Sequence, residues 1–195
     1  MGIPSAAFAT PGSDGWSQLD ADAKRDRLLA ASREVFAREG IDAPMPAIAV
    51  AAGVGVGSIY RQFPSKLDLL SALVIERLEE VEAAATAALG APDDAWSSLV
   101  ELIWEFGTRQ SEDDVVAEAM SCVLVEPHLE AARAQTNKAL AQLLAAARAE
   151  GRLREDATVL DIRMIFAAAR AAEKIEPGGW RRMIELGIDS LRPVR

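Results

Sequence analysis

The segment of residues 44–66 constrains the fold of this chain most, because proline and glycine divide it into two very short helices. Proline at position 46 precedes an apolar stretch over residues 47–52, and proline suits a first helical turn, where its missing N–H would have no partner. Gly53 ends this stretch after about two turns, and a second short helix is predicted near residues 56–62. Two short helices joined by a glycine turn within about twenty residues are typical of a helix-turn-helix.

Longer helices are predicted on both sides of this pair. Asp20 or Asp22 can cap a helix that runs to about Glu39, where Gly40 supplies a C-terminal stop. Ser65 can cap the helix that follows the pair. The rest of the chain shows helical periodicity between breakers, and no stretch alternates long enough to predict a strand. Helices are predicted near residues 93–109, 113–124, 129–150, 158–175 and 179–191.

These elements predict an all-α fold with an N-terminal three-helix helix-turn-helix domain followed by a larger helical domain. Half of the 195 residues are apolar, and abundant Ala and Leu favour helices packed on helices. The predicted parts are a flexible tail over residues 1–19, a helix-turn-helix domain over residues 20–66 and a helical domain over residues 67–195. No apolar run approaches the ~20 residues of a membrane span, and no secretory signal is visible. We therefore expect a cytoplasmic protein without membrane contact.

The net charge of −9 needs to be examined by segment, since an acidic protein is an unexpected partner for DNA. Residues 20–70 hold seven basic and seven acidic side chains, so this segment is neutral and the whole negative excess lies outside it. An acidic remainder would repel DNA and leave one end of the molecule as the contact surface.

Residues 47–70 resemble the DNA-binding signature of TetR-family repressors. The matching features are the small-residue helix, the turn at Gly53 and the block SIYRQFPSK over residues 58–66. Residues 27–40 are similar to that family's first helix. The resemblance implies a DNA-binding repressor without catalytic residues, cofactor or bound metal. It also implies a homodimer that binds a palindromic double-stranded operator and is released by a small hydrophobic effector.

The predicted recognition helix carries the groups that such an interface needs. A major groove about 12 Å wide admits a slim polar helix face. Tyr60 and Lys66 resemble the family's phosphate contacts, which fix register without reading sequence. Many relatives have Lys and His where Val56 and Gln62 stand, and Val56 is restricted to apolar contacts such as a thymine methyl group. The predicted DNA-binding residues are Met45, Pro46, Val56, Ser58, Tyr60, Arg61, Gln62 and Lys66.

Other classes of protein fit these residues less well. The run GVGVG over residues 53–57 suggests a nucleotide-binding turn, but the fingerprint needs a third glycine where Ser58 or Tyr60 stands. Cys122 and His128 are the only residues of their types, which argues against a metal or nucleophile site. An enzyme would need a cofactor motif or clustered acid–base groups, and a helical adaptor would not need the SIYRQFPSK block.

The resemblance implies an effector pocket and a dimer interface in residues 67–195. We hypothesise an apolar ligand contacted by some of Trp104, Phe106, Met120 and Cys122, although ordinary core packing also explains such side chains. The last two helices carry a continuous apolar stripe, which fits a two-fold helix bundle in the relatives and fits burial within one chain equally well. The predicted dimer residues are Val159, Ile162, Phe166, Trp180, Met183, Ile184, Gly187, Ile188 and Leu191.

Overall fold

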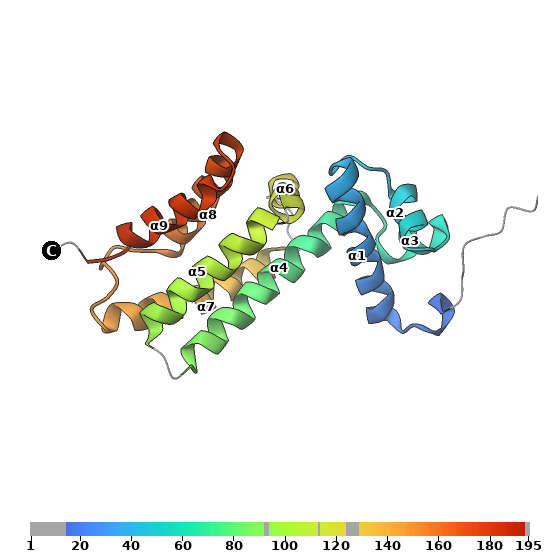
Figure 1. The fold of residues 1–195 in the computed structure, drawn as a ribbon. Coiled ribbons are helices and arrows are strands. Elements are labelled where there is room, and N and C mark those ends of the chain that lie inside the picture. The colour runs from blue at the N-terminus through green and yellow to red at the C-terminus, as the bar shows by residue number, and fades with distance from the viewer. Residues whose placement is uncertain (1–14, 92–93, 113, 124–128, 194–195) are drawn as a thin grey trace, which may run out of the picture. The chain divides into compact units, whose positions relative to one another are not determined.

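The computed structural model describes residues 15–91, 94–112, 114–123 and 129–193, and every regular element within these ranges is helical (Figure 1). This confirms the predicted all-α fold class. The elements are the 3-10 turn η1 (Trp16–Gln18) and the helices α1 (Ala21–Glu39), α2 (Met45–Ala51), α3 (Val56–Gln62), α4 (Lys66–Leu89), α5 (Ala95–Glu112), α6 (Asp114–Cys122), α7 (Glu130–Ala149), α8 (Val159–Ile175) and α9 (Gly179–Ser190).

The chain divides into two compact units after Leu69. The division falls inside α4, which begins at Lys66 in the first unit and continues to Leu89 in the second. The predicted domain boundary, after residue 66, lies at the start of the same helix. One continuous helix therefore belongs to both units.

The first helix of the N-terminal unit is held at both ends by local signals. Asp20 accepts a hydrogen bond from the Ala23 backbone N–H at 2.8 Å, as an N-cap residue does. The helix ends where Gly40 adopts a φ of +83°, which a residue without a side chain reaches at no steric cost. The buried face of α1 includes Leu28, Val35 and Phe36.

Helix α2 packs on α1 and α3 packs on α2, and a few side chains of this region are fully buried. Ile48 of α2, Ile59 of α3 and Phe63 just after α3 form this part of the core. The recognition helix has the predicted bounds, whereas α2 begins two residues earlier than predicted, at Met45. The reason is that Pro46 lies inside the first turn, where the helix requires no N–H from it.

The segment before α1 is less irregular than predicted. Gly15, with a φ of +118°, precedes a single 3-10 turn over Trp16–Gln18, and Trp16 is half-buried. A short regular turn thus lies within the segment that was predicted as a flexible tail over residues 1–19. Residues 1–14 of that tail lie outside the described part of the chain.

The C-terminal unit is built around α5, which lies against α7, α8 and α9. Ile103 of α5, Leu143 of α7, Ile162 of α8 and Ile184 of α9 are buried together in one apolar cluster. The observed helices start and end within three residues of the predicted ones, and α5 differs most because it continues to Glu112.

Polar contacts hold the helices of this unit in register. The Glu150 carboxylate accepts hydrogen bonds from the backbone N–H groups of Ala95 and Trp96, at 2.7 and 3.2 Å, and so satisfies the N-terminus of α5. The buried Thr136 hydroxyl of α7 donates to the Leu78 carbonyl of α4 at 2.9 Å. These bonds join segments that lie more than fifty residues apart.

The last two helices lie side by side with little room between them (Figure 1). A Cβ atom at Gly187 of α9 would lie 2.7 Å from Cγ1 of Ile165 on α8, and one at Gly179 would lie 2.7 Å from the Ala172 carbonyl oxygen. Real Cβ contacts are longer than this, so both glycines are required by the packing of α9 on α8.

Candidate nucleic-acid interface

The turn between α2 and α3 fixes the orientation of the recognition helix. Gly53 adopts a φ of +68°, a backbone conformation that L side chains rarely take. Arg27 of α1 reaches this turn and donates from Nε to the Ala52 carbonyl oxygen at 2.9 Å. Its Nη2 atom lies 3.1 Å from the position that a Cβ at Gly53 would occupy. The backbone conformation therefore favours glycine here, and a side chain would also displace the Arg27 guanidinium slightly.

The exposed edge of α3 consists of Val56, Gly57, Tyr60 and Arg61, whereas Ile59 faces the core. Ser58 and Gln62 are half-buried beside this edge. The five α3 residues that the sequence analysis named are thus all at least partly accessible. The edge offers the Tyr60 phenol, the Arg61 guanidinium and, at its N-terminal end, the Val56 side chain. Gln62 adds an amide beside it.

The predicted contacts from α2 differ in their accessibility. Pro46 is exposed, but Met45 is only 5 % exposed and belongs to the core. The Met45 side chain therefore presents no surface to DNA, because the first residue of α2 points inward. This position is removed from the set of predicted contacts.

Two cations of this unit lie over aromatic rings. The Arg25 guanidinium is 5.2 Å from the centroid of Phe63, and the Lys66 ammonium is 5.7 Å from the centroid of Phe36. Such contacts restrict long side chains that would otherwise move freely. Lys66 was predicted as a phosphate contact, whereas Arg25 and Arg27 were not identified from the sequence.

The first turn of α4 already contains a carboxylate. Asp68 accepts hydrogen bonds from the Ser65 backbone N–H at 2.8 Å and from the Ser65 hydroxyl at 2.7 Å, while the Asp68 N–H donates back to that hydroxyl at 3.1 Å. This capping box confirms Ser65 as the N-cap residue that the sequence predicted. The Lys66 ammonium takes no part in this capping box and provides a positive charge at the start of α4.

The C-terminal unit contains the side chains that were predicted to bind an effector. Trp104 packs against Trp180 of α9 with ring centroids 6.1 Å apart and an interplanar angle of 67°. Phe106 is buried, and the guanidinium groups of Arg77 and Arg109 lie 5.7 and 5.4 Å from its ring centroid. Met120 is half-buried on α6. The Cys122 side chain and His128 lie outside the described part of the structure.

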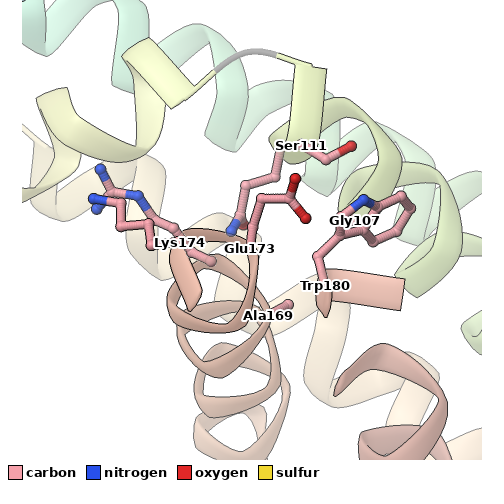
Figure 2. A pocket seen from close by; sticks show the side chains of 8 residues that line it. Gly107, Ser111, Ala169, Glu173, Lys174 and Trp180 are labelled. Atoms are coloured by element: carbon pink, nitrogen blue, oxygen red, sulfur yellow. The ribbon is translucent and has the colours of Figure 1, made fainter. Parts of the chain in front are cut away.

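A small cavity lies between α5, α8 and α9 (Figure 2). Its volume is about 90 Å³, well below the 300–1,000 Å³ of pockets that hold drug-sized ligands. Gln110 at its edge donates to the Phe166 carbonyl at 3.1 Å, and Glu173 accepts from the Gly178 N–H at 2.9 Å. The residues that line it are Gly107, Gln110, Ser111, Ala169, Arg170, Glu173, Lys174 and Trp180, and Trp104, Phe106 and Met120 are not among them.

The predicted dimer stripe faces the core of its own chain. Ile162, Trp180, Ile184, Gly187, Ile188 and Leu191 are buried, and Val159, Phe166 and Met183 are partly buried against the same cluster. Six of the nine predicted dimer residues are thus buried within their own chain, which is the alternative that the sequence left open. Four large apolar side chains of α8 and α9 are exposed, Leu160 (60 %), Met164 (57 %), Ile175 (84 %) and Leu186 (45 %).

Neither a metal centre nor a membrane span is found among the described residues. No group of three or more His, Cys, Asp or Glu side chains is arranged there to hold a metal ion. None of the described helices combines the length and the apolar character needed to cross a membrane.

Comparison with known proteins matches both parts of the chain. Residues 28–73 match the family model described as bacterial regulatory proteins of the tetR family, and residues 91–193 match the C-terminal domain model of SbtR-like transcriptional regulators. The HTH-type transcriptional repressor KstR of Mycolicibacterium smegmatis is 28 % identical over 146 residues, which is 72 % of each chain.

Solved structures of similar fold support the same assignment. The TetR transcriptional regulator SCO0520 of Streptomyces coelicolor is 28 % identical with a TM-score of 0.63, and the match covers 88 % of this chain and 99 % of that one. FadR of Thermus thermophilus, a repressor solved with lauroyl-CoA, shares the fold at 20 % identity and a TM-score of 0.59, with 86 % of this chain and 92 % of that one covered. The C-terminal match alone spans more than half of the chain. The protein therefore belongs to the TetR family of bacterial transcriptional regulators, which bind DNA and are not enzymes.

Proposed function

We propose that this protein is a ligand-responsive repressor that binds a palindromic operator as a homodimer and acts in the cytoplasm of a bacterium. The observation that carries the proposal is the exposed edge of α3, held outward by Arg27 and the glycine turn. The chain is similar to KstR, a protein described as a repressor, over 72 % of each chain. This similarity supports repression rather than activation of transcription.

The homodimer follows from the size of the recognition helix. A seven-residue helix reads few base pairs, and a two-fold pair of helices reads two half-sites one helical turn apart. We assign the dimer face to the outer side of α8, where Leu160, Met164 and Ile175 fall within about 60° of one another around the helix axis. Leu186 of α9 is a further exposed apolar side chain of this helix pair.

Selection from a random DNA library tests operator binding directly. We expect wild-type protein to enrich an inverted repeat, and Lys66→Ala and Tyr60→Phe to weaken binding about equally on all sequences because these residues contact phosphate. The Lys66 variant should also reduce the slope of log K against log salt by about 1. Enrichment of no sequence would refute the proposed function, and an unchanged salt slope would refute the role of Lys66.

The proposed effector is a small apolar molecule that binds the C-terminal unit. Trp104 and Phe106 are engaged by Trp180 and by two arginines, and the described cavity is too small for a drug-sized ligand. We therefore infer that the effector stabilises another conformation of this unit, in which these rings separate, and that this shift in population lowers operator affinity.

Tryptophan fluorescence and operator release together test this step. Hydrophobic candidate compounds should quench or shift the emission of wild-type protein and release the operator at the same concentrations. Trp104→Ala should change the concentration required, while Trp16→Phe, which alters a tryptophan of the other unit, should not. If no compound moves either signal, or if Trp104→Ala responds like wild type, the effector site is wrongly placed.

A further inference from the structure

We propose that this regulator reads thymine in each operator half-site through the thymine 5-methyl group, and that Val56 makes the contact. The inference rests on the proposed function and deepens it, because it names the base chemistry that the recognition helix selects. It is carried by the accessible side chains of α3 and by the space beside them.

The N-terminal turn of a recognition helix is the part that reaches base edges. In this protein that turn consists of Val56, Gly57 and Ser58. Val56 is 41 % exposed, Gly57 has no side chain and the Ser58 hydroxyl is half-buried. The most accessible side chain of this turn is therefore apolar.

Gly57 makes room for a base next to Val56. A Cβ atom built at Gly57 would have no heavy atom within 4 Å, apart from its chain neighbours and the backbone of its own helix, so the surface there is open. The α3 backbone can consequently approach the floor of a groove closely at this point. The Val56 methyl groups then reach the depth at which base edges lie.

The larger polar groups of α3 lie toward its other end. Arg61 donates from Nε to the carbonyl oxygen of Gly57 at 3.1 Å, which holds the guanidinium along its own helix. Gln62, the last residue of α3, is half-buried. These side chains can contact bases or phosphates elsewhere in the half-site, but they do not replace Val56 at the N-terminal turn.

The chemistry of the major groove then selects the partner of Val56. The edges of adenine, guanine and cytosine present hydrogen-bond donors and acceptors there, and thymine alone adds a methyl group. A valine pressed against a donor or acceptor leaves that group without water and without a partner, which is unfavourable. Contact between Val56 and the thymine methyl group buries apolar surface on both sides.

Replacing thymine by uracil in the selected operator tests the contact, because it removes only the methyl group and preserves base pairing. We expect one thymine position per half-site at which uracil raises the Kd by about fourfold, the value of one buried methyl group, and by about fifteenfold when both half-sites are changed. With Val56→Ala protein, the same uracil substitution should change the Kd less than twofold, as a double-mutant cycle requires of interacting groups.

Val50→Ala is the matched control variant, because Val50 is also an exposed valine (73 %) of the helix-turn-helix but lies on α2. This protein should keep the full sensitivity to uracil. The proposal is overturned if uracil has no effect at any thymine, if the effect persists in Val56→Ala, or if Val50→Ala abolishes it instead. Failure of the proposed function looks different, since wild-type protein would then enrich no operator in which to place uracil.

Discussion

Arg25 and Arg27 stand two positions apart on α1, yet they contact different parts of the helix-turn-helix. Arg27 bonds the carbonyl oxygen at the end of α2, whereas Arg25 lies over the ring of Phe63 just after α3. The first arrangement uses the side chain to fix the backbone of the turn. The second holds a guanidinium near the C-terminal end of the recognition helix, where DNA phosphates flank the groove.

We predict that Arg25 contacts a phosphate. Arg25→Gln should weaken operator binding on all sequences and reduce the slope of log K against log salt by about 1. Arg27→Gln should leave that slope unchanged but lower the free energy of unfolding by about 1.5 kcal/mol, since a charged hydrogen bond is lost. Arg38→Gln, at the exposed far end of α1, is the control for charge alone. A salt slope equal to that of wild type in Arg25→Gln would show that this arginine only supports Phe63.

The sequence predicts only some of the residues of the candidate interface. The positions on α3 could be predicted because helical spacing and the resemblance place them on one short element. Arg27 could not, because its partner Ala52 lies 25 positions away and a contact of that range leaves no local pattern. Met45 was assigned to the surface because sequence alone does not show which way the first residue of α2 points.

For the helices, capping residues made the ends of most elements predictable. The face of α8 and α9 that is buried could not be predicted. Both sides of α8 carry apolar side chains, for example Ile162 and Ile165 on one side and Leu160 and Met164 on the other. Periodicity detects a stripe without showing what covers it. Close packing of α9 through Gly187 selects the side that is buried in this chain.

Gly187 is therefore predicted to be intolerant of a side chain. Gly187→Ala should lower the free energy of unfolding by about 1–3 kcal/mol, because the added methyl group would overlap Ile165. Chemical denaturation monitored by tryptophan fluorescence measures this change. Gly57→Ala, where no such neighbour exists, should be neutral or slightly stabilising. The double variant Gly187→Ala, Ile165→Ala should lose less than the sum of the single variants, and strict additivity would contradict the predicted overlap.

The capping box at the start of α8 predicts a specific dependence of the folding stability on pH. Asp161 accepts hydrogen bonds from the Thr158 hydroxyl and from the Thr158 backbone N–H, both at 2.7 Å, and these bonds lower the pKa of the Asp161 carboxyl below its ordinary 3.8. A lowered folded-state pKa stabilises the fold above about pH 3.8, and this contribution is lost as the pH falls through the lower folded-state value.

Thermal unfolding of wild type and Asp161→Asn at several pH values tests this link. The difference in Tm should be constant between about pH 7 and pH 5. It should shrink below about pH 3.8, where the Asp161 carboxyl is protonated in the unfolded chain, and disappear once the pH falls below the lowered folded-state pKa. Other carboxylates are common to both proteins, so they cancel in the difference. A difference that stays constant into acid would mean that the Asp161 charge contributes nothing to the cap.

At the scale of the whole molecule, the exposed surface of α8 predicts the oligomeric state. Leu160→Asp combined with Met164→Asp should convert a dimer into monomers in sedimentation experiments, because charged groups would be buried unpaired at the interface. Operator affinity should fall about a hundredfold, since two linked recognition helices bind far more tightly than one. Leu89→Asp, which alters an exposed leucine of α4, should leave both measurements unchanged. A double variant that remains dimeric would place the dimer face elsewhere.

The edge-to-face pair of Trp104 and Trp180 joins α5 to α9, and α9 in turn packs along α8. If the effector separates the two rings and the dimer face lies on α8, as we propose, effector and second subunit act on the same pair of helices. Effector binding and subunit association are then thermodynamically linked, and each alters the equilibrium of the other by the same factor. On this proposal, the effector concentration needed for half-maximal release of the operator should vary with the concentration of the protein itself.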